Sequence, residues 1–138
     1  MLRGLTTVNF FADDVAEARD WYAEALGVEA YFERPVDDRP AYIEFRIGDY
    51  QHELGILDSR FAPHRGADGP AGAMVYWHVD EIEPVMDRFV ALGATVHQRP
   101  IKHGEGFVTA SVRDPFGNVL GLMYNEHYLQ IWDSLPTP

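Results

Sequence analysis

Hydrophobic and polar positions follow one order that is used twice along the chain. Apolar residues alternate from Leu5 to Phe11, which is the period of a strand with one buried face. Residues 14–27 then change to helical spacing, with Asp14 and Glu17 placed as a capping box and Gly27 as the stop. The apolar stripe of this helix consists of Val15, Ala18, Tyr22, Ala25 and Leu26. A strand followed by an amphipathic helix is therefore predicted.

The same order returns in the second half. A strand is predicted from about Met74 to Val79, and a helix that ends at Gly93 follows it. The stripe of this second helix consists of Ile82, Val85, Met86, Phe89 and Leu92. Three extended segments follow each helix, at 28–33, 42–47 and 52–57 and then at 95–99, 106–112 and 119–124, with His103–Gly106 as a loop.

Each half thus reads strand, helix, strand, strand, strand. This predicts an α+β chain of two tandem βαβββ modules, the first at residues 1–58 and the second at residues 74–125. Residues 59–73 are rich in Gly and Pro and are predicted to be a linker. The tail, residues 126–138, is predicted to form a short helix that docks onto the body or a partner subunit through Tyr128, Leu129, Ile131 and Trp132.

Composition and charge exclude several classes of function. The 138 residues are 46% hydrophobic, which suffices for a folded core, and the net charge of −11 repels phosphate backbones and anionic lipid. Nucleic acid and membrane are therefore not expected as partners. Cysteine is absent, which excludes disulfides and thiolate sites, and no apolar run is long enough to span a bilayer. A soluble, cytoplasmic protein is expected.

A doubled module followed by the turn Asp114–Asn118 (DPFGN) resembles the vicinal oxygen chelate superfamily, also called the glyoxalase, bleomycin resistance and extradiol dioxygenase superfamily. The resemblance covers nearly the whole chain. Asp-Pro and Gly-Asn are turn-forming pairs in their own right. The resemblance implies curled mixed sheets that form a cleft, commonly within a homodimer.

Enzymes of this superfamily hold a divalent metal with side chains from four positions, which match Thr7, Gly55, Met74 and Gly121. Two glycines supply no side chain, a thioether is a weak ligand for hard ions, and one hydroxyl does not hold a metal alone. We therefore predict that the chain has no metal site and no cofactor. A one-residue difference in register would bring His52 or Glu53 into the site, so a metal site outside the family's pattern stays open.

Strand alternation separates the residues that pack under the helices from those that line the implied cleft. The first set is apolar: Val8, Phe10, Leu54, Ile56, Val75, Trp77, Val79, Leu120 and Leu122. The cleft set mixes rings, methionines and hydrogen-bonding groups, which suits a small, partly aromatic ligand. The predicted ligand-binding residues are Asn9, Phe11, Tyr42, Glu44, Arg46, Glu53, Met74, Tyr76, His78, Phe107, Thr109, Ser111 and Met123.

These features predict a metal-free protein that sequesters a small molecule, as the bleomycin resistance type does in antibiotic resistance. The alternative is a glyoxalase-like lyase or isomerase, or a dioxygenase, that acts in the same cleft. A metal-free enzyme would use His78, Glu53 or Tyr76 as acid or base, although a structural role for His78 is also open. A third alternative is a protein-interaction role without a small ligand.

Overall fold

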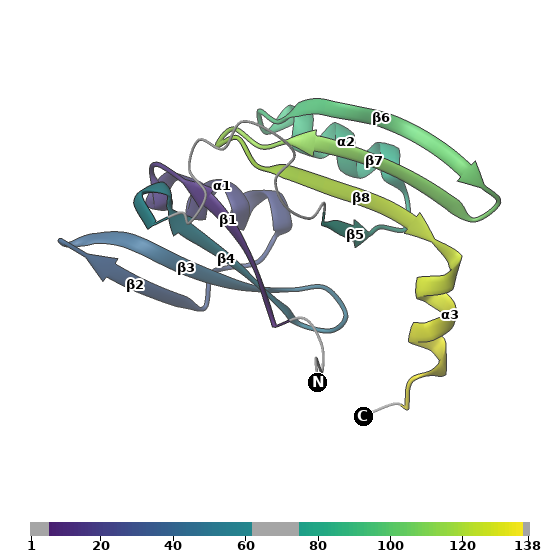
Figure 1. Ribbon diagram of the computed structural model, residues 1–138, viewed down its shortest axis with the longest axis horizontal. Coiled ribbons are helices and arrows are strands. Elements are labelled where there is room, and N and C mark those ends of the chain that lie inside the picture. Colours follow the sequence, from purple (N-terminus) through teal and green to yellow (C-terminus); the bar gives the residue numbers. More distant parts are fainter. Residues whose placement is uncertain (1–5, 62–74, 137–138) are drawn as a thin grey trace. The chain divides into compact units, whose positions relative to one another are not determined.

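The computed structural model describes residues 6–61 and 75–136 (Figure 1). Its elements, in chain order, are β1 Thr7–Ala12, α1 Val15–Leu26, β2 Phe32–Val36, β3 Arg39–Ile47, β4 His52–Asp58, the 3₁₀ turn η1 Ser59–Phe61, β5 Tyr76–His78, α2 Ile82–Ala91, β6 Thr95–Gly104, β7 Phe107–Arg113, β8 Val119–Asn125 and α3 Glu126–Ser134. The α+β class and the two tandem βαβββ modules are confirmed. Most of the predicted linker, at residues 62–73, lies outside the described residues.

The chain divides into two compact units. Unit 1 comprises Met1–Ala71 together with Phe116–Asn118, and unit 2 comprises Gly72–Pro115 and Val119–Pro138. The turn between β7 and β8 therefore belongs to unit 1, although both strands belong to unit 2. Asn118 ties this turn to β1. Its side chain accepts a 2.9 Å hydrogen bond from Phe11 N and donates a 2.8 Å hydrogen bond to Phe11 O.

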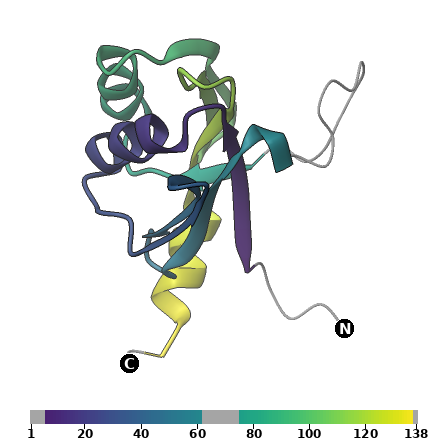
Figure 2. The same cartoon turned by 90° about the vertical axis from the view of Figure 1, so that its left-hand side faces the viewer.

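Unit 1 is a four-stranded sheet in the order β1-β4-β3-β2, here called sheet 1. Strand β1 pairs with β4 in parallel, and the other pairs are antiparallel. Helix α1 packs against one face of this sheet (Figure 2). Its Tyr22 is fully buried, with its ring centroid 6.1 Å from that of Phe10 and 6.4 Å from that of Phe45. The predicted stripe of α1 therefore faces the apolar side of sheet 1.

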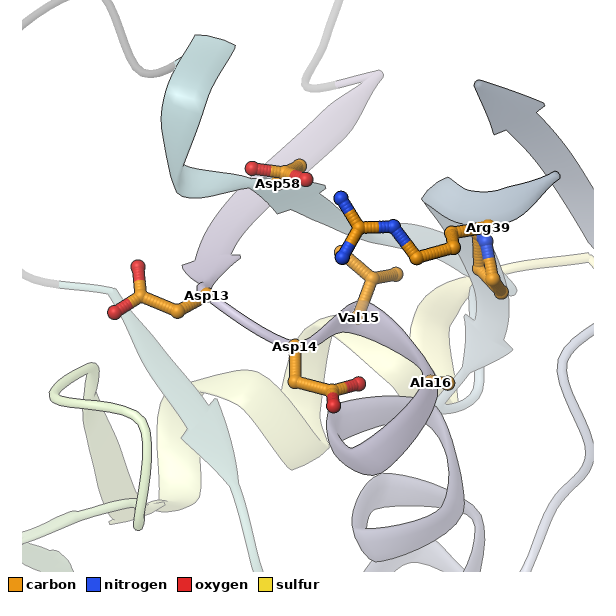
Figure 3. Close-up of a pocket in the computed structure, with 7 residues that line it drawn as sticks. Asp13, Asp14, Val15, Ala16, Arg39 and Asp58 are labelled. Atoms are coloured by element: carbon orange, nitrogen blue, oxygen red, sulfur yellow. The ribbon is translucent and has the colours of Figure 1, made fainter. Parts of the chain in front are cut away.

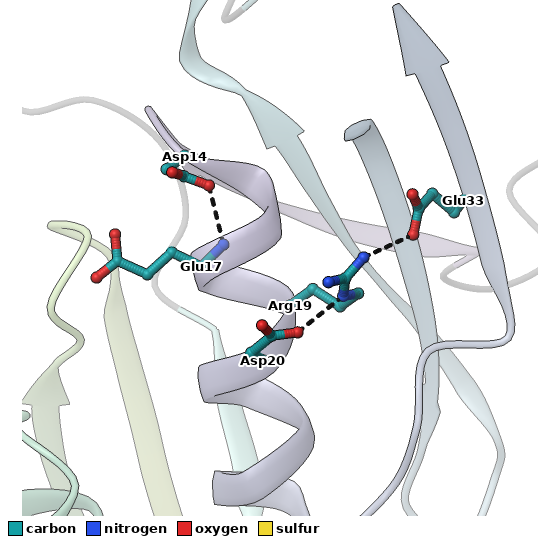
Figure 4. A network of polar contacts seen from close by, with 5 residues as sticks. All are labelled: Asp14, Glu17, Arg19, Asp20 and Glu33. Atoms are coloured by element: carbon teal, nitrogen blue, oxygen red, sulfur yellow. Dashed lines mark hydrogen bonds and ion pairs between the residues drawn. The ribbon is translucent and has the colours of Figure 1, made fainter. Parts of the chain in front are cut away.

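The structure confirms the predicted cap at the beginning of α1 and the predicted glycine at its end. The Asp14 carboxylate accepts a 2.9 Å hydrogen bond from Glu17 N, and Gly27 has the left-handed φ of 70° that ends helices. Arg19 joins the helix to β2 through a 3.0 Å ion pair with Glu33, and it also forms a 2.9 Å ion pair with Asp20 of the same helix (Figure 4). Asp14 thus fixes where α1 begins, and Arg19 ties the helix to an edge strand.

The predicted boundaries of several strands are wrong, and those of β2 and β6 change the picture most. Strand β2 lies at Phe32–Val36 instead of 28–33, because its position is set by pairing with β3 and not by an apolar pattern of its own. Strand β6 continues to Gly104, so that His103 lies in a strand and not in a loop. The pairing of β6 with β7 contains register shifts, which a simple period does not reveal.

Unit 2 is a second four-stranded sheet, sheet 2, in the order β5-β8-β7-β6. Helix α2 packs on it through Ile82, Met86 and Phe89, which are buried. The facing side of sheet 2 is apolar, with Ala110, Val112, Leu120 and Leu122 buried. The predicted tail helix is present as α3, which continues directly from β8 (Figure 1). Among residues 6–61 and 75–136, no helix is long and apolar enough to cross a membrane.

Candidate functional site

The open face of sheet 1, the face opposite α1, carries the unit 1 residues that strand alternation predicted. Strand pairing places Thr7, Glu53 and Arg46 in one row across β1, β4 and β3. Asn9, Gly55 and Glu44 form the next row, and Phe11, Leu57 and Tyr42 form the third. The structure therefore brings together all six predicted site residues of this unit, namely Asn9, Phe11, Tyr42, Glu44, Arg46 and Glu53.

Glu53 is held by two neighbours in its own row. The Thr7 hydroxyl donates a 2.7 Å hydrogen bond to Glu53 Oε2, and Arg46 forms a 3.0 Å ion pair with Glu53 Oε1. Arg46 also donates a 3.3 Å bond to Gln51 O, and its guanidinium lies 5.0 Å from the centroid of the Tyr31 ring. The Glu53 carboxylate is thus charge-paired within the protein.

Glu44 is surrounded by aromatic side chains. The Tyr31 hydroxyl donates a 3.1 Å hydrogen bond to Glu44 Oε2, and the Tyr42 hydroxyl also bonds to Glu44. The ring of Phe32, the cross-strand neighbour of Glu44, lies edge-on 6.2 Å from that of Tyr42. Partial burial, followed by the nearby Glu44 charge and hydrogen bond, raises the pKa of Tyr42 to about 12. Tyr42 is therefore a neutral hydrogen-bond donor at physiological pH.

This pKa predicts how stability depends on alkaline pH. The folded protein holds the Tyr42 proton up to about 12, whereas the ordinary value is 10.0. The free energy of unfolding should therefore fall as pH rises from 10.0 to about 12. We expect Tyr42→Phe to reduce this slope in urea denaturation at a series of alkaline pH values. An unchanged slope would show that Tyr42 titrates alike in the folded and unfolded states.

At Gly55 and Gly121, two of the positions that match the family's metal ligands, neighbouring side chains fill the space. A Cβ at Gly55 would overlap Asn9 Oδ1 and would lie 2.7 Å from the Tyr42 ring. A Cβ at Gly121 would lie 2.5 Å from both Tyr76 Cδ1 and the Val75 carbonyl oxygen. No carboxylate side chain starts at either position without displacing these groups. The residues present therefore do not fit the metal that the superfamily's enzymes hold.

The remaining possible donors do not form an alternative metal site in the part of the chain that the structure describes. No three His, Asp or Glu side chains converge there in a way that could hold a metal ion. Glu53, the potential ligand beside Gly55, is engaged by Arg46 and Thr7. Met74 lies outside the described residues.

On the face of sheet 2 opposite α2, some of the predicted site residues are exposed and others are buried. Tyr76 and Phe107 are exposed there, and Met123 is half-buried. Thr109 and Ser111 lie on the same face but are buried, and each is covered by a histidine of β6. His103 Nε2 lies 2.7 Å from Thr109 Oγ1, and His97 Nδ1 lies 2.9 Å from Ser111 Oγ. Sequence reasoning missed both histidine contacts because the register shifts of β6 alter which side its residues take.

His78 lies on this face of sheet 2, but α3 covers it. Its ring stacks on Tyr128 at 4.5 Å between centroids, and its side chain is only 9% exposed. Nδ1 accepts a 3.3 Å hydrogen bond from Asn125 N, which leaves the neutral ring's proton on Nε2. Nε2 lies 3.5 Å from Asp80 Oδ1 without forming a hydrogen bond. His78 therefore holds the start of α3 through Tyr128, whereas Ile131 and Trp132 of the same helix are exposed, so that the predicted docking of the tail is seen for Tyr128 and not for these two residues.

A separate pocket of about 170 Å³ lies at the beginning of α1 (Figure 3). It is lined by Asp13, Asp14, Val15, Ala16, Arg39, Pro40 and Asp58. Its carboxylates have structural partners: Asp14 caps α1, and hydrogen bonding from Arg60 lowers the pKa of Asp58. Pockets for small molecules usually measure about 300–1,000 Å³. We therefore interpret this pocket as a structural feature at the beginning of α1 and not as a ligand-binding site.

The doubled modules and the DPFGN turn agree with a comparison of the chain with known protein families. The family model "Glyoxalase/Bleomycin resistance protein/Dioxygenase superfamily" matches residues 4–122. The chain belongs to this superfamily. The resemblance predicted from the sequence is thereby confirmed, and α3 lies beyond the matched region. No curated protein sequence matches the chain.

Several solved structures share the fold at low sequence identity. TioX from Micromonospora sp. ML1 is 16% identical over 88% of this chain and 98% of its own, with a TM-score of 0.66. UcmS2 is 21% identical over 91% and 100%, with a TM-score of 0.67. A lactoylglutathione lyase from Agrobacterium tumefaciens is 20% identical over 88% and 93%, with a TM-score of 0.63. These similarities show the fold and not the function.

Proposed function

We propose that this superfamily member is a metal-free protein that binds and sequesters a small, partly aromatic molecule. The observation that carries the proposal is the filling of Gly55 and Gly121 by neighbouring groups, where the superfamily's enzymes place metal ligands. What remains on the open face of sheet 1 is a surface of rings and hydrogen-bonding groups. Such a surface favours stacking and orientation of a ligand over metal-assisted chemistry.

The enzymatic alternative has less support from the candidate acids and bases. His78 is covered by Tyr128 and accepts a hydrogen bond from Asn125, so it is not presented to a substrate. Glu53 is paired with Arg46, and the raised pKa of Tyr42 disfavours a phenolate base at neutral pH. Tyr76 is exposed but has no general base within the contacts that the structure describes. Binding without turnover is the function that these contacts favour.

A ligand screen by native mass spectrometry, covering aromatic natural products and glutathione adducts, tests this proposal. We expect a bound aromatic compound to be recovered chemically unchanged. Phe11→Ala should then weaken its binding by about 1–3 kcal/mol in calorimetric titration, because a ring on the open face of sheet 1 is removed. Tyr76→Ala tests in the same way the predicted contribution of sheet 2.

Phe61→Ala is the matched control, since Phe61 is an exposed ring outside both open faces and should not affect binding. Conversion of the bound compound to a product would favour the enzymatic alternative. Equal binding by Phe11→Ala, Tyr76→Ala and the parent protein would contradict the proposed faces.

The homodimer stays a prediction. Sedimentation would test it by showing about twice the 15.7 kDa of the chain.

A further inference from the structure

Strand pairing places two carboxylates, Glu44 and Glu53, and two arginines, Arg34 and Arg46, on the open face of sheet 1. Glu53 is neutralised by Arg46 at 3.0 Å. Glu44, on the same face, has no ion-pair partner within residues 6–61 and 75–136, and its contacts are the hydroxyls of Tyr31 and Tyr42. A carboxylate offers about four acceptor positions, so two tyrosine donors leave capacity for a further donor. Among the described residues, the carboxylate of Glu44 therefore forms no ion pair, although Arg34 lies on the same face, and it can accept a bond from a charged donor.

Three aromatic rings frame Glu44, and the backbone holds them in place. Tyr31 N donates a 3.0 Å hydrogen bond to Glu44 O, which fixes Tyr31 beside the carboxylate. Phe32 is the cross-strand partner of Glu44. Tyr42 lies two residues before Glu44, on the same side of β3. Tyr31 is 50% exposed and Phe32 is 41% exposed, so both rings are accessible from solvent.

Aromatic rings beside a carboxylate favour cations. A ring attracts a positive group over its face, and the attraction increases when the group is partly desolvated. The Tyr31 ring already shows this behaviour, since the Arg46 guanidinium lies 5.0 Å from its centroid. The net charge of −11 would also favour the approach of a positively charged molecule.

We propose that the ligand of this face is an aromatic cation, whose positively charged nitrogen binds Glu44 among the rings of Tyr31, Phe32 and Tyr42. This inference rests on the proposed small-molecule-binding function and adds the charge of the ligand to it. The ligand's ring system contacts Phe32 and Tyr42, and its charged N–H or N-alkyl group lies against the carboxylate. Neutral and anionic aromatic compounds lack the group that Glu44 would bind.

Two related dyes provide the test. Proflavine is a planar aromatic cation at neutral pH, and acridine is its uncharged parent ring in mildly alkaline buffer. We expect the protein to bind proflavine at least about tenfold more tightly than acridine, measured by fluorescence titration of each dye. Glu44→Gln keeps the size and the acceptor oxygen but removes the charge, and it should abolish most of this difference.

Glu17→Gln is the matched control. It removes the same charge from an exposed position on α1, away from the open face of sheet 1, and should leave the preference for proflavine intact. A preference that falls equally in both variants would show a general effect of net charge and would overturn the inference. So would equal affinity for the two dyes in the parent protein.

The two proposals fail in different ways. If both dyes bind alike and Phe11→Ala weakens both, the aromatic-binding function stands and the role of Glu44 is wrong. If neither dye binds the parent protein, the aromatic-binding function itself is contradicted. Thermal denaturation of Glu44→Gln should match the parent protein, since Glu44 lies on the open face and not in the core.

Discussion

Replacing Tyr22 with Ala is expected to lower the free energy of unfolding by about 3–5 kcal/mol, the usual cost of truncating a large buried ring. Tyr22 is fully buried, and its ring lies between those of Phe10 in β1 and Phe45 in β3. The cavity left by Ala would face α1 on one side and sheet 1 on the other. Urea denaturation followed by circular dichroism measures this change.

Tyr31→Ala is the matched control for this prediction. Tyr31 belongs to the same unit but is 50% exposed, so its loss should change stability by about 0.5 kcal/mol or less. Equal destabilisation by the two substitutions would contradict the packing of α1 on sheet 1. A large effect of Tyr22→Ala alone would confirm that the face of sheet 1 under α1 is the core of unit 1.

Gly121→Ala is expected to destabilise the protein by about 1–3 kcal/mol, as overpacking does. The new methyl group would lie 2.5 Å from the carbonyl oxygen of Val75 and 2.5 Å from the Tyr76 ring. A side chain can rotate away, but the backbone oxygen also accepts the hydrogen bond from Gly121 N and is held in place. The expected cost therefore comes mainly from the shift of β5 relative to β8.

Gly104→Ala is the matched control for Gly121→Ala. Nothing lies within 4 Å of a Cβ at Gly104, and its φ is outside the left-handed region. Thermal denaturation should show a lower Tm for Gly121→Ala and little change for Gly104→Ala. If Gly121→Ala were as stable as Gly104→Ala, the space at the family's metal position would not be filled.

The elements with strong local signals could be predicted from the sequence. Helix α1 has its cap at Asp14, its stop at Gly27 and a regular stripe between them, and the structure agrees. In strands β1 and β4, alternation combined with the positions matched to the superfamily predicted which residues pack under the helix, and Phe10, Leu54 and Ile56 are buried there. Strand β2 could not be placed in the same way, because its FERPV segment is mostly exposed and its position depends on pairing with β3.

The contacts of the candidate site that sequence reasoning missed join distant parts of the chain. His78 was predicted to line a cleft, but Tyr128 of α3 stacks on it, and no local pattern links a strand residue to a helix so far along the chain. Asn118 was recognised as a turn residue, yet its side chain also binds the backbone of Phe11. The tyrosines around Glu44 depend likewise on the register between β2 and β3.

Titration of the purified protein with its screened aromatic ligand, before and after removal of divalent metals by chelation, tests the central claim most directly. We expect the same affinity and stoichiometry in both samples, because the binding groups are the rings and polar side chains of the open faces and not a metal. Loss of binding on chelation, with recovery on addition of zinc, nickel, iron or manganese, would contradict metal-free binding and indicate a metalloenzyme.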